Sequence, residues 1–148
     1  MIPKKILVCT DFSENSVPAR VLAIEFARAF QAELLILHVV NTRFFGYPTF
    51  ADRIPMDLAL IQQNIEEGAA EELELLANDS SREVEHVRAF RRSGAPAEEI
   101  IKFAEEEGVG LIVMGTHGWT GVRHLILGST AENVVRMANC PVLTVRVE

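Results

Sequence analysis

Short apolar runs recur along this chain and predict the strands of a buried sheet. The first, residues 5–10 (KILVCT), shows no alternation of polar and apolar side chains, which is typical of a strand covered on both faces in a parallel sheet. Residues 33–40 and 111–114 predict further buried strands, and residues 142–147 predict a last strand. Residues 83–90 (EVEHVRAF) alternate imperfectly, so we expect them to form a strand at the sheet edge.

Amphipathic stretches between these runs predict helices. Proline is tolerated only in the first turn of a helix, so Pro18 places a helix start near Ser16. Apolar residues at helical spacing then predict the stripe that this helix buries. Its expected members are Val17, Val21, Ile24 and Ala27.

Three later segments also predict helices. Residues 57–77 predict a long amphipathic helix, with a stripe formed by Leu58, Ile61, Ile65, Ala69, Leu73 and Leu76. Residues 94–96 open another helix, which ends at Gly108, a residue type that commonly terminates helices. Residues 129–138 predict the last helix.

Strands and helices alternate, so the sequence predicts one α/β domain with a doubly wound, open parallel sheet and helices on both faces. The length of 148 residues is common for a single domain. Residues 41–55 break the alternation with four aromatic residues, a glycine and two prolines, and they predict a loop.

Composition and charge exclude several classes of function. Hydrophobic residues make up 49% of the chain, and the net charge is −7. A nucleic-acid-binding protein usually carries a basic stripe, whereas the tight basic cluster here is limited to Arg88, Arg91 and Arg92. The acidic balance also disfavours binding to an anionic membrane, and no apolar run reaches the roughly 20 residues of a membrane span.

The cysteines and the N-terminus indicate the compartment. Cys9 and Cys140 are expected at opposite ends of parallel strands, too far apart for a disulfide, so we expect two reduced thiols. The apolar run at the N-terminus is too short for the core of a signal peptide. We therefore expect a cytoplasmic protein.

Residues 115–129 (GTHGWTGVRHLILGS) are the most informative stretch for function. They follow a buried strand and lead into a helix, the place where open α/β sheets bind ligands. Glycines there allow positive φ and close approach of a ligand, and a helix N-terminus at Gly128, Ser129 and Thr130 favours a phosphate. An alternative stays open, because Ser129 and Glu132 also have the spacing of a capping box.

The pattern Gly115-x-x-Gly118, nine residues, then Gly128-Ser129 resembles the nucleotide-binding motif of universal stress proteins. The stretches KILVCTDFSENS, HVV, GLIVMGTHG and AENVVRMANCPVLTVRV are also similar to that family. The similarity covers nearly the whole chain. It implies the sheet order 3-2-1-4-5 and an ATP pocket between the first and fourth strands.

The resemblance also implies roles for individual residues. Asp11 corresponds to the acid that binds the ribose, and Thr10 and Val39 correspond to backbone contacts near the adenine. The implied lining residues are Met114, Gly115, His117 and Gly118, and the implied phosphate ligands are Gly128, Ser129 and Thr130.

Other interpretations of these side chains remain possible. Asp11 can instead cap the turn that follows it. A phosphate-accepting aspartate would need acidic neighbours for Mg²⁺, which the preceding residues do not supply. His117 is expected to position a ligand rather than to catalyse, because no partner nucleophile is evident. His38 is expected to be a core histidine.

The histidines show no metal-ligand spacing, so any Mg²⁺ is expected to be held chiefly by the nucleotide's phosphates.

Three functions follow as hypotheses. The first is an ATP-binding protein of stress response or signalling. The second is a slow ATPase or an enzyme that transfers adenylyl or phosphoryl groups, and the third is an interaction module with a vestigial pocket.

Residues 142–147 offer an open sheet edge, and pairing of two such edges predicts a homodimer, as the family resemblance also implies.

Overall fold

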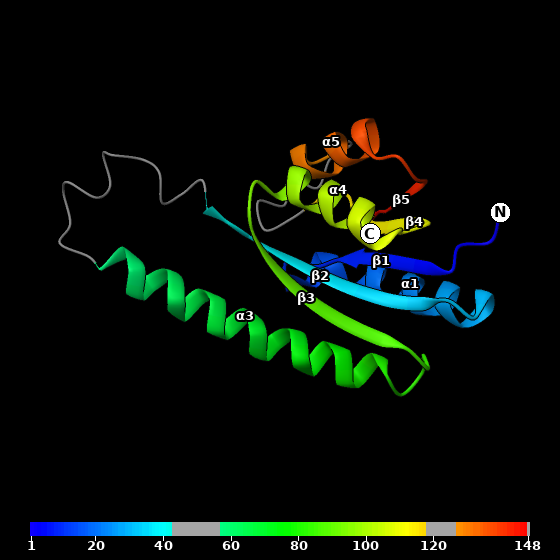
Figure 1. Ribbon diagram of the computed structural model, residues 1–148, viewed down its shortest axis with the longest axis horizontal. Helices are drawn as coiled ribbons and strands as arrows, with labels where there is room; N and C mark the ends of the chain where they lie inside the picture. Colours follow the sequence, from blue (N-terminus) through cyan, green and yellow to red (C-terminus); the bar gives the residue numbers. More distant parts are fainter. Residues whose placement is uncertain (43–56, 118–126, 148) are drawn as a thin grey trace.

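A computed structural model describes residues 1–42, 57–117 and 127–147. Its centre is a parallel five-stranded sheet with the order β3-β2-β1-β4-β5 (Figure 1). The strands are β1 (Lys5–Cys9), β2 (Glu33–Asn41), β3 (Val87–Gly94), β4 (Leu111–Gly115) and β5 (Val142–Val145). The helices are α1 (Val17–Phe30), α3 (Leu58–Ser80), α4 (Pro96–Glu107) and α5 (Ser129–Met137). The predicted fold class and the strand order implied by the family resemblance are both confirmed.

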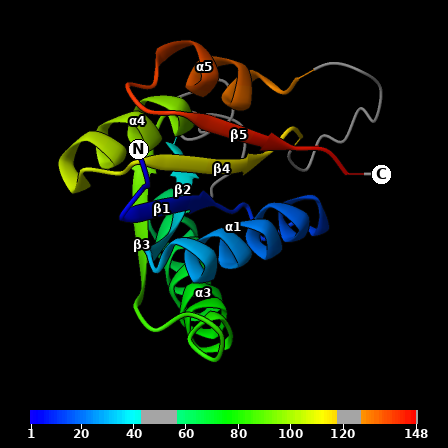
Figure 2. The ribbon, with the colours of Figure 1, turned by 90° about the vertical axis from the view of Figure 1, so that its right-hand side faces the viewer.

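Alternate residues of the central strands point to opposite faces of the sheet, and each face has its own apolar core. Ile6 and Val8 of β1 pack with α1 and α3, whereas Leu7 packs with α4 and α5. Figure 2 shows α1 and α3 on one side of the sheet and α4 and α5 on the other. Burial on both faces explains why the runs in β1, β2 and β4 lack alternation.

The predicted stripe of α1 was partly wrong. Val17 and Val21 are 42% and 49% exposed, whereas the predicted Ile24 and Ala27 are buried together with Ala19 and Ala23. The alanines recur every four residues and let the helix approach β1 and β4 closely. A stripe chosen by side-chain hydrophobicity favours valine over alanine, so it included Val17 and Val21 and left out Ala19 and Ala23.

The edge strand β3 also differs from its prediction. It begins at Val87 rather than at residue 83, and it continues to Gly94 rather than to residue 90. The N–H groups of Glu83 and Val84 both donate to the carbonyl of Ser80, 3.0 Å away in each case. These bonds close the turn after α3, so residues 83 and 84 cannot pair with β2, and Val84 is buried in the core instead.

The other predicted boundaries differ by a few residues at most. Asp57 caps α3, because its carboxylate accepts from the N–H of Leu60 at 3.1 Å, and the helix runs on to Ser80. Both cysteines carry free thiols. Among the described helices, no segment combines the length and the hydropathy of a membrane span. The predicted loop at residues 41–55 lies almost wholly outside the described residues.

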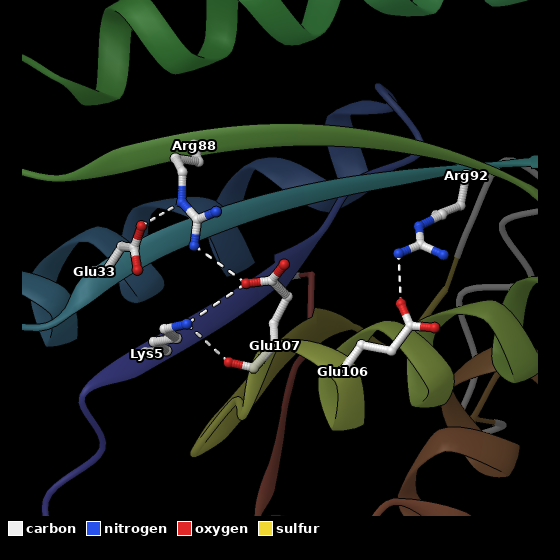
Figure 3. A network of polar contacts seen from close by, with 6 residues as sticks. All are labelled: Lys5, Glu33, Arg88, Arg92, Glu106 and Glu107. Carbon is white, nitrogen blue, oxygen red and sulfur yellow. Dashed lines mark hydrogen bonds and ion pairs between the residues drawn. The ribbon is translucent and has the colours of Figure 1, made fainter.

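The C-terminal end of α4 is tied to the sheet by charged groups (Figure 3). Lys5 Nζ donates to the backbone carbonyl of Glu107 at 2.9 Å and lies 3.5 Å from its carboxylate. Arg88 of β3 bonds both Glu107, at 3.2 Å, and Glu33 of β2. Glutamates at a helix C-terminus are unfavourable for the helix dipole, and these cations offset that cost.

The basic cluster on β3 is therefore part of the fold. Arg92 pairs with Glu106 at 2.6 Å, and Arg91 donates to the backbone carbonyl of Glu66 in α3. Together with Arg88, these side chains join β3 to α3 and α4. Holding the far end of α4 in place also fixes its N-terminus, which opens at the carboxyl edge of the sheet.

Candidate functional site

A cavity of about 520 Å³ opens at the carboxyl ends of β1, β2 and β4. This is the size range of small-ligand sites, and this edge is where open α/β sheets bind ligands. The predicted residues that line it are Thr10, Asp11, Val39, Met114, Gly115, His117, Gly128, Ser129 and Thr130. Gly118, the remaining predicted residue, lies outside the described residues.

Further lining residues were not predicted from the sequence. Apolar wall residues come from the far sides of the cleft: Ile65 of α3, and Pro96 and Ile100 of α4. Ile65 belongs to the predicted stripe of α3. It is nevertheless 44% exposed, because at this point of the helix the stripe faces the cavity rather than the core. The N-terminus of α4 could have been expected here, since every helix that follows a parallel strand starts at this edge. The remaining unpredicted residues are Cys9, Ser16, Leu37, His38, Val40, Asn41, Thr116 and Ala131.

Asp11 sits in a tight turn between β1 and α1. Its Oδ1 accepts from the backbone N–H of Ser13 at 2.9 Å and from the Ser13 hydroxyl. Asp11 therefore stabilises the local turn and borders the cavity as well. It does not cap α1, which follows a short 3-10 turn at Glu14–Ser16.

His38 is not the core histidine that the sequence predicted. It is half-buried near the end of β2 and borders the cavity. Its Nδ1 lies 2.8 Å from the carbonyl oxygen of Thr10, and its ring packs against the ring of Phe12 with centroids 4.3 Å apart. Burial lowers the pKa of His38 below its usual value.

The two described glycines of the site lack the positive φ that was one of their predicted uses. Neither Gly115 nor Gly128 has positive φ; among the described glycines that conformation occurs at Gly94 and Gly108. A Cβ on Gly115 would lie 3.0 Å from the carbonyl oxygen of Asn15, and one on Gly128 would lie 3.0 Å from that of Thr116. Both glycines allow two stretches of backbone to touch where they form the cavity wall.

The start of α5 is not a capping box. Gly128 is the N-cap, Ser129 is the first helical residue, and no side chain caps the helix. The N–H of Glu132 donates to the carbonyl of Gly128 at 2.9 Å, as in an ordinary first turn. Gly128 N–H donates to Thr116 O at 2.7 Å, which brings this turn back beside the end of β4. Ser129 and Thr130 in the first turn of α5 therefore border the cavity, and the first N–H groups of a helix have no partner within the helix itself.

His117 and Cys9 border the same cavity but differ in chemistry. His117 Nδ1 lies 2.9 Å from the Thr116 hydroxyl, and its Nε2 is buried with no hydrogen-bond partner among the described residues. Burial raises the pKa of the Cys9 thiol to about 12, so this thiol stays protonated and is a poor nucleophile. Within the described residues, no group of three potential metal ligands comes together.

The comparisons with known proteins agree with this geometry. The model of the "Universal stress protein family" matches residues 3–146. Universal stress protein MJ0531 of Methanocaldococcus jannaschii is 37% identical over 144 residues, which cover 97% of this chain and 82% of that protein. The solved structure of MJ0577 from the same organism has a TM-score of 0.86 and 33% identity, covering 100% of this chain and 99% of that one.

A universal stress protein from Archaeoglobus fulgidus, solved in complex with dAMP, has a TM-score of 0.66. It is 24% identical, and the match covers 97% of this chain and 98% of that one. This likeness establishes a shared fold.

Proposed function

This chain belongs to the universal stress protein family, and we propose that it is an ATP-binding member acting in a stress response or in signalling. The observation that carries the proposal is one open cavity bordered both by Asp11 and by the first turn of α5. A carboxylate suits sugar hydroxyls, and a helix N-terminus suits a phosphate. The A. fulgidus protein holds an adenine nucleotide on the same fold.

The proposed pose follows the chemistry of the cavity wall. The adenine lies against apolar residues of the cavity wall: Val39 of β2, Met114 of β4 and Ile100 of α4. The ribose hydroxyls donate to Asp11, and the phosphates accept from the N–H groups at Ser129 and Thr130. Mg²⁺, if it accompanies ATP, is held chiefly by phosphate oxygens.

ATP acts in this proposal as a ligand rather than as a substrate. Its binding orders the cavity wall and biases the encounter with a protein partner. A cytoplasmic location is part of the proposal, because the two free cysteines suit a reducing compartment.

We also propose a homodimer through residues 142–147. The sheet has two edges, β3 and β5. Arginines on β3 discourage pairing at that edge, whereas β5 (VLTV) carries no charged side chain. Val135 and Met137 of α5 and Val147 after β5 also have exposed apolar side chains.

Calorimetric titration with ATP tests the proposed ligand. The wild type should bind ATP, and Asp11→Asn should weaken binding about tenfold, because the variant loses a charged acceptor for the ribose hydroxyls. Asp79→Asn is the matched control, since it makes the same change at the far end of α3 and should bind like the wild type. Absence of ATP binding by the wild type at millimolar concentrations would refute the proposal. Steady release of ADP that is abolished in His117→Ala would favour the enzymatic alternative.

A further inference from the structure

The turn that carries Asp11 contains an unusual backbone conformation. Phe12 has φ of 65°, in the left-handed region that residues other than glycine rarely adopt. Such a conformation persists only where its surroundings fix it, and it is often found at functional sites. Part of the fixing is local, since Phe12 N–H donates to the hydroxyl of Thr10 at 3.0 Å and Ser13 N–H donates to Asp11.

Further support comes from His38, on the neighbouring strand. A carbonyl oxygen can only accept, so the 2.8 Å contact with Thr10 O requires the hydrogen on His38 Nδ1. The imidazole ring also packs against the ring of Phe12, with an angle of 34° between their planes. His38 therefore holds the turn at two points, one on each side of Asp11.

We propose that His38 is a positioning residue that fixes the turn at residues 10–13, aims Asp11 at the sugar hydroxyls and so sets the selectivity of the cavity for ribose. This inference rests on the proposed function, because it concerns how that ligand is recognised. His38 acts through the backbone of Thr10 and the ring of Phe12.

Three substitutions of His38 separate a positioning role from a packing role. His38→Phe keeps an aromatic ring against Phe12 but removes the donor to Thr10 O. In His38→Asn the amide nitrogen takes the place of Nδ1, so the donor is restored without the ring. In His38→Gln the amide nitrogen reaches instead to the place of Nε2, which makes it the matched control for the amide group.

Affinities for ATP and for 2′,3′-dideoxy-ATP are the measurement. The wild type should prefer ATP about tenfold, because the dideoxy sugar has neither of the two hydroxyls that would donate to Asp11. In His38→Phe and His38→Gln this ratio should fall close to one, and in His38→Asn most of it should return. A merely structural role would weaken both ligands equally and leave the ratio unchanged, and that result in a folded His38→Phe overturns the inference.

A second measurement needs no ligand. Nitrogen-15 NMR of the wild-type imidazole should find the neutral ring protonated at Nδ1, and protonation at Nε2 instead would overturn the inference. This readout keeps it falsifiable if His38→Phe does not fold. Failure of the wild type to bind ATP would overturn both proposals, whereas ATP binding with an unchanged ratio in His38→Phe overturns this inference alone.

Discussion

The two cysteines place the same functional group in different surroundings. Burial raises the pKa of Cys9 to about 12, and burial also raises the pKa of Cys140, where a hydrogen bond with the backbone of Ile112 acts in the opposite direction. Because the thiolate is the reactive form, iodoacetamide should label Cys140 faster than Cys9 in the folded protein. Peptide mapping by mass spectrometry measures this, with unfolded protein as the control. Equal labelling rates before unfolding would contradict the prediction.

At single positions, the sequence predicts where residues lie better than why they are there. Gly115 and Gly128 were correctly expected around one cavity, yet their cause is contact between backbone segments. His38 was expected in the core, because an apolar run in the sequence does not indicate which of its residues border a cavity. Such contacts join residues far apart in the chain, and local sequence carries no record of them.

Among the elements, two glycines in helices provide a matched test. Gly108 ends α4 with φ of 67°, whereas Gly68 lies inside α3, and a Cβ at either position meets no atom within 4 Å. Gly108→Ala should destabilise the protein by about 1 kcal/mol, because alanine is strained in the left-handed region. Gly68→Ala should stabilise it by about 0.5–1 kcal/mol, because alanine loses less entropy in a helix.

Urea denaturation measures both free energies of unfolding. The opposite signs are the decisive feature, since the two variants share the same chemical change and both add their methyl group to open space. Stabilisation by Gly108→Ala would show that the left-handed end of α4 does not persist in solution.

Element types and order could be predicted from periodicity, but the faces and ends of elements depend on neighbours. The alanine face of α1 is chosen by its close approach to the sheet, and the start of β3 is set by the turn that closes on Ser80. The shift of β3 changes its pairing, so that Val87 lies beside Leu34 and Gly94 beside Asn41. Sequence patterns weigh each segment alone and cannot include these constraints.

At the scale of the whole molecule, charges between α4 and the sheet make stability depend on pH. The Arg88 guanidinium holds the pKa of Glu33 below its usual value. The folded state therefore binds this proton less readily than the unfolded chain, so the stabilisation is present above the unfolded pKa and is lost as pH falls through the folded pKa. The free energy of unfolding should decrease less for Glu33→Gln than for the wild type between about pH 6 and pH 3.

Urea denaturation at a series of pH values tests this. Arg88→Gln removes the other partner of this ion pair and should also flatten the pH dependence. A Glu33→Gln curve parallel to that of the wild type would mean that this pair contributes nothing to acid sensitivity.

The proposed dimer depends on which groups of β5 face away from the sheet. The carbonyls of Pro141 and Val145 accept from the N–H groups of Ile112 and Thr116. Backbone groups alternate along a strand, so the N–H of Thr144 points to the open edge instead. Thr144→Pro removes that donor while sparing the bonds to β4, so it should convert the dimer to a monomer. Ala89→Pro is the control, because it also introduces a proline at an outward position of the other edge strand, β3, and should leave the dimer intact. Sedimentation analysis gives the masses; a monomeric wild type, or a Thr144→Pro variant that remains dimeric, would exclude pairing through β5.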